Sequence, residues 1–214
     1  MPRTANDVSD TAGNIIATIS LNSGLIFERL RQRTKKLSAY ASLLRDLPST
    51  NVATDVRDYQ KRYNGFYKVR FPQETWRVHY YGLLQAKKAD RNISFSEVIR
   101  ELHRLTHRIE QSFSSKLLAT IRPELPVYDI ELCGHMNVVK PLGYMSMEDR
   151  IRKWIVEYDR MIAVAGCVVQ TPEFRKLSKT FDQEFPLHKG FTNTKKLDLM
   201  LWQCRENDGS GGNA

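Results

Sequence analysis

The sequence predicts an all-α protein that folds as a single-domain helical bundle. Apolar residues recur at helical spacing along most of the chain, and the prolines fall between these runs. No segment alternates convincingly between apolar and polar residues as a half-buried strand does. The chain has 214 residues, enough to bury a core without disulfides or a structural metal. We expect one domain over residues 1–206, with residues 1–12 poorly ordered and a disordered Gly-rich tail at 207–214.

The first half of the chain contains four expected helices. Apolar residues at helical spacing predict one helix over residues 25–47, which Pro48 ends. Two further helices are expected over 55–67 and 74–87. The fourth begins at Ser94-Phe-Ser-Glu97, which has the form of a capping box.

The second half continues in the same way. A short helix is expected over residues 113–121, and Ser146 caps a long helix after it. Thr171-Pro172-Glu173 is a good helix start, because proline suits the first helical position. Thr194 opens the last helix. Short extended pieces are expected only at 67–71 and 126–128, so helices dominate the expected fold.

Charge and cysteine usage indicate the class of partner and the compartment. Lys and Arg number 33 against 24 Asp and Glu, giving a net charge of +9. Such a balance points to a polyanionic partner, with nucleic acid ahead of an acidic membrane surface. Cys133, Cys167 and Cys204 form no C-x-x-C pair, which favours a reducing compartment. No targeting or membrane-spanning segment is visible, so we expect a cytoplasmic protein without a membrane partner.

The most informative stretch is Thr106 to Met136, THRIEQSFSSKLLATIRPELPVYDIELCGHM. A helix junction rich in small hydroxyl residues leads to a Lys and a Leu-Leu pair, and a Pro-bounded extended piece then delivers Asp129. This layout resembles the helix-hairpin-helix superfamily of DNA glycosylases. In that family an aspartate begins the next helix and faces the base-binding cleft. The chain also resembles uncharacterised bacterial and prophage proteins that share SFxSKLL–LPVxD and a C-terminal KKLDxxLWQ.

The resemblance implies a DNA-binding enzyme that excises a damaged or modified base. Asp129 is then the catalytic carboxylate, because breaking the N-glycosidic bond builds positive charge on the sugar that a carboxylate stabilises. Lys116 is the second catalytic candidate, although the nucleophilic lysine of lyase members lies further before the aspartate. Asp129 also suits the simpler role of capping the next helix, and the two roles are compatible.

The family's hairpin carries glycines whose N–H groups approach a DNA phosphate, and the segment 106–115 has none. Hydroxyl groups are expected to take their place, with a helix N-terminus that also favours an anion. The nucleic-acid-binding candidates in and after this hairpin are Arg108, Ser112, Ser114, Ser115 and Tyr128.

A second group of candidates lies between Tyr59 and Tyr81, where aromatic and basic residues interleave. Such interleaving is typical of strand-binding surfaces and equally of core helices with charged outer faces. The helical spacing of Tyr59, Tyr63 and Trp76 favours the core. The surface candidates for nucleic-acid binding are Arg62, Lys68 and Arg70, and a separate basic stripe comprises Arg29, Arg33 and Lys36.

Metal and cofactor chemistry is not expected. His103 and His107 have a spacing that can hold a metal, but the sequence assigns no third ligand. No Gly-rich phosphate loop and no G-x-S-x-G is present, which argues against an NTPase or a serine hydrolase. The favoured function is therefore a DNA glycosylase. The alternatives are a non-catalytic nucleic-acid-binding or mobile-element accessory protein on the same fold, and an interaction protein with an acidic protein partner.

Overall fold

The computed structural model describes residues 5–204, except for the side chains of residues 5, 6, 130 and 131. All of the regular secondary structure in these residues is helical. The helices are α1 (Ala5–Leu21), α2 (Ser23–Arg31), α3 (Thr34–Asp46), α4 (Tyr59–Tyr67), α5 (Glu74–Lys87), α6 (Phe95–Thr106), α7 (Gln111–Ile121), α8 (Ile130–His135), α9 (Met147–Gln170), α10 (Pro172–Glu184), the 3-10 turn η1 (Pro186–His188) and α11 (Asn193–Leu201). The all-α prediction is confirmed for these residues.

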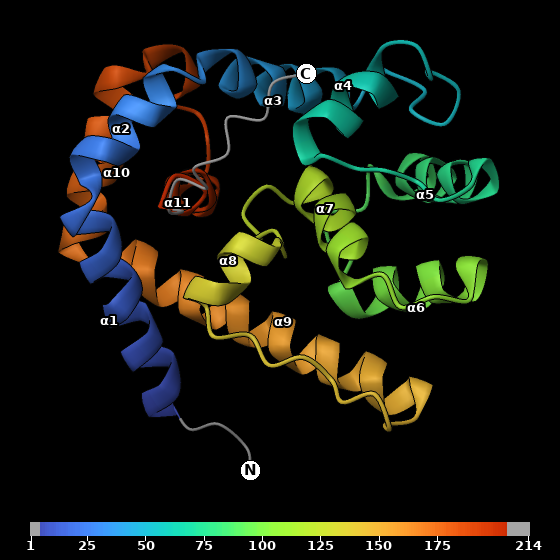
Figure 1. Ribbon diagram of the computed structural model, residues 1–214. Helices are drawn as coiled ribbons and strands as arrows, with labels where there is room; N and C mark the ends of the chain where they lie inside the picture. Colours follow the sequence, from blue (N-terminus) through green and yellow to red (C-terminus); the bar gives the residue numbers. More distant parts are fainter. Residues whose placement is uncertain (1–4, 205–214) are drawn as a thin grey trace, which may run out of the picture.

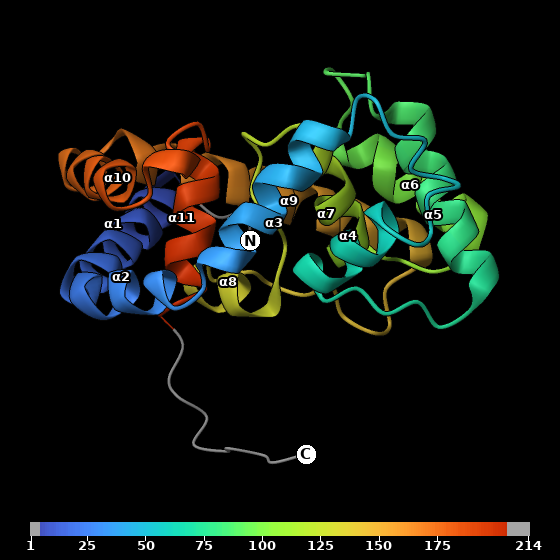
Figure 2. The same ribbon diagram turned by 90° about the horizontal axis from the view of Figure 1, so that it is seen from above.

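The helices surround a central group formed by α7, α8 and α11 (Figure 1). The long helix α9 runs beneath this group and packs against α1 over much of the length of α1. Seen from above, α3 crosses between the half of the molecule that holds α1, α2, α10 and α11 and the half that holds α4 to α7 (Figure 2). The central position of α11 explains why its residues 194–201 are buried, charged ones included.

Tyrosines from α4 and α5 fill the core between these helices. Tyr59, Tyr63, Tyr80 and Tyr81 are fully buried, and the Tyr63 and Tyr80 hydroxyl groups lie 2.7 Å apart in a hydrogen bond. Burial raises the pKa of each of these tyrosines, because the phenolate is poorly solvated there. Tyr59, Tyr63 and Trp76 are therefore core residues, as their spacing predicts.

Helix ends follow the local signals closely. Ser94 and Glu97 form both arms of the capping box at the start of α6. The Ser146 hydroxyl accepts a hydrogen bond from the Asp149 N–H at the start of α9, and Thr171 accepts one from Phe174 at the start of α10. These hydrogen bonds satisfy backbone donors that a helix N-terminus leaves without partners.

Two expectations near the N-terminus are wrong. Residues 5–12 belong to α1, whose buried side chains Ala12, Ile15 and Ile19 share one helical face. The helix expected over 25–47 is two helices, because Arg33 leaves helical geometry with φ −117° and ψ 22°. The chain turns a corner there (Figure 1), and no proline or glycine marks the turn. The expected tail at 207–214 lies outside the described residues.

Candidate functional site

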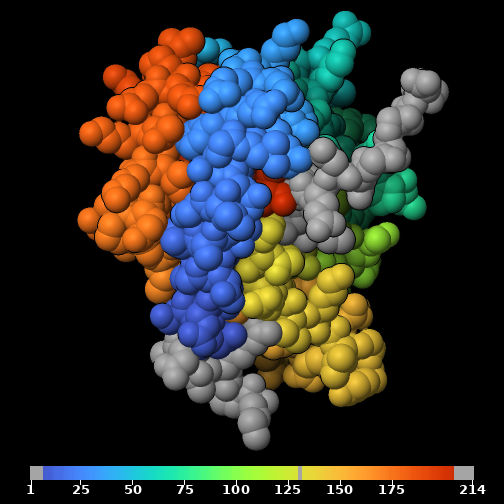
Figure 3. Space-filling model, turned by 60° about the vertical axis from the view of Figure 1, so that its left-hand side comes forward, coloured from blue at the N-terminus to red at the C-terminus, as the bar shows by residue number. Residues whose placement is uncertain are grey.

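Asp129 and Lys116 line the same pocket, which lies between α4, α7, α8 and α11. The space between the lining side chains amounts to about 340 Å³, open solvent included. Its lining residues are Phe66, Tyr67, Lys116, Val127, Asp129, Leu132, Lys195, Asp198, Leu199 and Trp202. Two lysines and two aspartates thus meet three aromatic rings in one cavity. The end of α11 reaches the surface in a gap between α2–α3 and α8 (Figure 3).

The segment that leads to Asp129 is held in place on two sides. The Tyr128 N–H donates to the Ser115 hydroxyl at 2.8 Å, and the Ser112 hydroxyl donates to the Tyr128 carbonyl at 3.2 Å. The Val127 N–H donates to Asp198 Oδ2 at 3.3 Å. These hydrogen bonds tie the segment to α7 and to α11, so Asp129 sits at the start of α8 in a fixed position at the pocket wall.

Lys116 extends from α7 and is 8% exposed. Burial lowers the pKa of its ammonium group, and the nearby Asp129 carboxylate partly opposes that effect. The Nζ atom lies 6.0 Å from the centre of the Phe113 ring. A buried amine with a lowered pKa gives up its proton more readily than a surface lysine does.

A second lysine–aspartate pair completes the pocket. Lys195 and Asp198 are 3% and 5% exposed, and their Nζ and Oδ2 atoms lie 3.4 Å apart. Burial raises the pKa of Asp198 to about 6, although Lys195 and the Val127 N–H oppose the shift. Burial lowers the pKa of Lys195, and Nζ stands 4.6 Å from the centre of the Tyr40 ring. The other carboxylate oxygen of Asp198, Oδ1, has no hydrogen-bond partner among the described residues.

Lys195, Asp198 and Trp202 line the pocket but are not among the site residues predicted from the sequence. All three belong to the KKLDxxLWQ segment, and their spacing of three and then four residues places them on one face of α11. This spacing, together with the LPVxD and SFxSKLL segments, is the feature of the sequence that could have marked these three residues as site residues. The three segments meet at the one pocket, since Lys116, Val127 and Asp129 line it as well.

The serines of the hairpin use their hydroxyl groups inside the protein. Ser114 is fully buried and donates to the Glu110 carbonyl at 2.7 Å, and fully buried Ser115 donates to the Ser112 carbonyl at 3.0 Å. In this conformation both hydroxyl groups bind backbone carbonyl groups of the protein instead of pointing outward to bind a phosphate. The Ser112 hydroxyl group likewise donates to the Tyr128 carbonyl. The Tyr128 ring is buried edge-on against Trp154.

The basic candidates occupy different places. Arg108 is exposed and pairs with Glu110 at 2.9 Å. Arg62 is half-buried between two aspartates, 2.7 Å from Asp58 and 2.9 Å from Asp46. Arg70 is exposed a few residues after α4. None of these three arginines lines the pocket, and neither does Lys68. The Lys68 Nζ atom lies 5.8 Å from the centre of the ring of Trp202, which does line it.

The two histidines bring no further ligands together. His107 ends α6 with a positive φ of 57°, and His103 lies one turn before it. Among the side chains that the structure describes within residues 5–204, no group of three or more His, Cys, Asp or Glu has the arrangement of a metal site. No helix in the same part of the chain is both long enough and apolar enough to cross a bilayer.

Fold and pocket together define an all-helical protein with a charged, aromatic-walled cavity at the meeting point of four helices. No family model matches the chain, and no curated protein or solved structure matches it either. The pocket's own chemistry therefore carries the functional argument.

Proposed function

We propose that this chain is a cytoplasmic DNA-binding protein of the helix-hairpin-helix glycosylase type, which excises a damaged or modified base. One observation carries the proposal: Asp129 and Lys116, separated by a turn and an extended segment, line the same aromatic-walled pocket. The helical hairpin of α6 and α7, followed by the extended segment to Asp129, supports the glycosylase-like topology. The net charge of +9 supports a polyanionic partner.

The proposed reaction is hydrolysis of the N-glycosidic bond. A water molecule attacks the sugar C1′ atom, and Asp129 accepts the proton that this water loses. The bond between C1′ and the base breaks, its electron pair leaves with the base, and a proton from Lys116 neutralises that base. Because burial lowers the pKa of Lys116, its ammonium group is a better acid near neutral pH than an exposed lysine. The products are the free base and an abasic sugar.

The aromatic walls support a base as the bound group. Phe66, Tyr67 and Trp202 line the pocket beside the charged residues. A base that leaves the helical stack loses stacking energy, and an aromatic wall restores part of it. Developing positive charge on the sugar is stabilised by a carboxylate in a cavity that holds little water.

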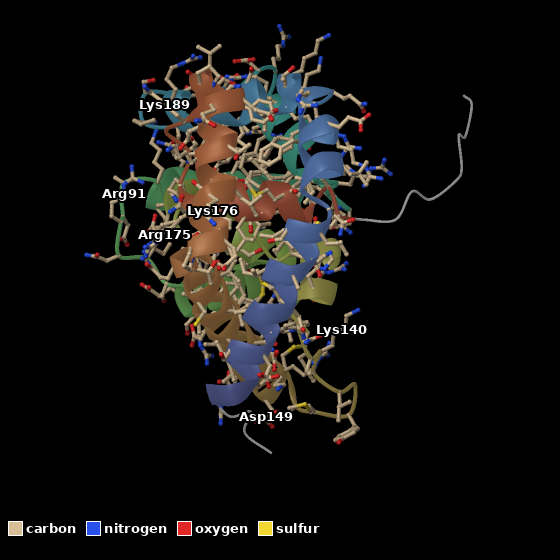
Figure 4. All side chains as sticks on the ribbon, turned by 90° about the vertical axis from the view of Figure 1, so that its left-hand side faces the viewer. Arg91, Lys140, Asp149, Arg175, Lys176 and Lys189 are labelled. Carbon is tan, nitrogen blue, oxygen red and sulfur yellow. The ribbon has the colours of Figure 1, made fainter. Side chains whose placement is uncertain are left out.

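The test is product formation from oligonucleotides that each carry one altered base, such as uracil, hypoxanthine, oxidised guanine or an alkylated purine. We expect free base in the mass spectrum and alkali-sensitive abasic sites. Asp129→Asn should lower the rate by about 10²-fold or more, the usual contribution of a positioned acid–base group. Asp149→Asn is the matched control, since that exposed aspartate lies at the far end of α9 (Figure 4). An unchanged rate in Asp129→Asn refutes the role given to that residue.

A non-catalytic nucleic-acid-binding protein on the same fold is the second candidate. The narrowness of the pocket favours it, because the enclosed part has room for about one or two water molecules. A base enters only if Trp202 or a neighbouring side chain moves. Salt-dependent DNA binding without product, unaffected by Asp129→Asn, identifies this second function.

A further inference from the structure

Three cationic side chains gather around Trp202 at the edge of the pocket. The Lys36 Nζ atom lies 6.0 Å from the centre of the Trp202 ring, and the Lys68 Nζ atom lies 5.8 Å from it. Arg33 and Lys36 both line a small cavity that Trp202 lines as well. We propose that these four residues, the Trp202 surface, bind the phosphates of a nucleic-acid strand and hold one nucleotide at the mouth of the pocket. This inference rests on the proposed nucleic-acid function and adds where the strand lies.

The fold brings these residues together from separate elements. Arg33 precedes α3, Lys36 lies in its first turn, and Lys68 is the C-terminal cap of α4 with a positive φ of 51°. Trp202 directly follows α11. In the sequence Arg33 and Lys36 belong to one basic stripe and Lys68 to an unrelated segment, so only the folded chain makes them one surface.

The Lys36 and Lys68 ammonium groups lie 6.0 Å and 5.8 Å from the centre of the same ring. The positive potential of two such groups favours an arriving anion. An aromatic ring flanked by ammonium groups has the chemistry that binds single strands, with a base on the ring and phosphates on the cations. A nucleic-acid strand therefore fits this surface better than an isolated anion, because an isolated anion has no base that could stack on the ring.

Trp202 links this surface to the pocket, because it lines both cavities. Lys36 and Lys68 reach one ring from two different elements, α3 and the end of α4, so they suit two phosphates that flank a single nucleotide. The base of that nucleotide would lie over Trp202, next to the opening that leads to Asp129. The hairpin serines are internal, and this surface supplies phosphate contacts that they do not.

The experiment compares two triple variants of the full chain by titration of a fluorescent single-stranded oligonucleotide at several salt concentrations. Arg33→Gln, Lys36→Gln and Lys68→Gln remove the proposed contacts. Arg175→Gln, Lys176→Gln and Lys189→Gln remove the same charge from an exposed face that looks away from the pocket (Figure 4).

We expect the first triple variant to bind about tenfold to hundredfold more weakly at low salt. Its slope of log affinity against log salt should fall by about 2, because each lost phosphate contact removes about 0.7 from the slope. The control variant should keep the slope of the native chain. Equal losses in both variants overturn the Trp202 surface and leave the proposed function standing. A native chain that binds no oligonucleotide at any salt concentration overturns both.

Tryptophan fluorescence gives a second readout that is independent of the triple variants. Trp76 and Trp154 are buried, whereas Trp202 lies at the proposed contact. Oligonucleotide binding should therefore quench the native chain, and Trp202→Phe should abolish that change while the chain stays folded by circular dichroism. Quenching that persists in Trp202→Phe contradicts the proposal. If the first triple variant does not fold, the fluorescence of Trp202→Phe tests the Trp202 surface on its own.

Discussion

Replacing Lys195 by methionine tests whether the buried pair in the pocket is as tightly coupled as its geometry indicates. Methionine keeps most of the apolar stem and removes the ammonium group that lies 3.4 Å from Asp198. Asp198, 5% exposed, then has no neutralising partner, which typically costs 3–5 kcal/mol for a buried pair, as an order of magnitude. We therefore expect a large loss of unfolding free energy, and one that depends on pH.

The pH dependence follows from the pKa of Asp198. Burial raises this pKa from 3.8 to about 6 in the native chain. A raised folded-state pKa means that stability is fully present below the unfolded pKa and is lost as the pH rises through the folded one. Without Lys195 the folded pKa rises further. Near pH 8 the variant should therefore lose about 3 kcal/mol of unfolding free energy more than the native chain, at about 1.4 kcal/mol per pKa unit. Near pH 5 the carboxyl group is largely protonated in both proteins, so this added loss is below about 1 kcal/mol.

The assay is urea unfolding of the native chain and of Lys195→Met at both pH values. Lys196→Met is the matched control, because Lys196 is equally buried but pairs with Asp182, whose side chain is 36% exposed and can be hydrated instead. The control should show no comparable dependence on pH. A loss in Lys195→Met of the same size at both pH values refutes the reasoning, as does a loss below about 1 kcal/mol near pH 8.

Three further predictions concern the hairpin, a helix start and the cysteines. Ser115→Ala removes the acceptor of the buried Tyr128 N–H and should cost about 1–3 kcal/mol in urea unfolding, so an unchanged midpoint contradicts that hydrogen bond. Ser94→Ala removes the cap of α6 and should cost about 1 kcal/mol, whereas Ser94→Gly should cost only a few tenths. Iodoacetamide at pH 8 should modify exposed Cys167 well before Cys133, because burial raises the pKa of Cys133 to about 12. Mass spectrometry of the peptides checks the order, and faster labelling of Cys133 would show that its surroundings open readily.

Where local interactions determine the start of a helix, the sequence alone is enough to predict its position. The start of α6 rests on Ser94 and Glu97, and that of α10 on Thr171 and Pro172. The members of each pair lie within three residues of each other in the chain. The break at Arg33 carries no such local signal. It follows from the direction that the chain takes around the other helices, which is a property of the whole fold.

The candidate site divides in the same way. Asp129 and Lys116 belong to one continuous stretch, and its sequence predicts the order of helix, extended segment and aspartate. Lys195 and Asp198 look like the solvated face of an ordinary helix until the central position of α11 buries them. Ser114 and Ser115 show the converse, since the sequence reveals the hydroxyl groups but not the carbonyl groups that already bind them.

The central claim is that a nucleobase binds in the pocket between α4, α7, α8 and α11, and photochemical cross-linking tests it most directly. When it is irradiated, an oligonucleotide that carries iodouracil forms a covalent bond to the aromatic side chain against which the iodouracil stacks. Peptide mass spectrometry then locates the adduct. We expect it on Trp202, Tyr67 or Phe66, the aromatic residues of the pocket wall. Adducts confined to other surfaces, in a chain that binds the oligonucleotide, would contradict the claim.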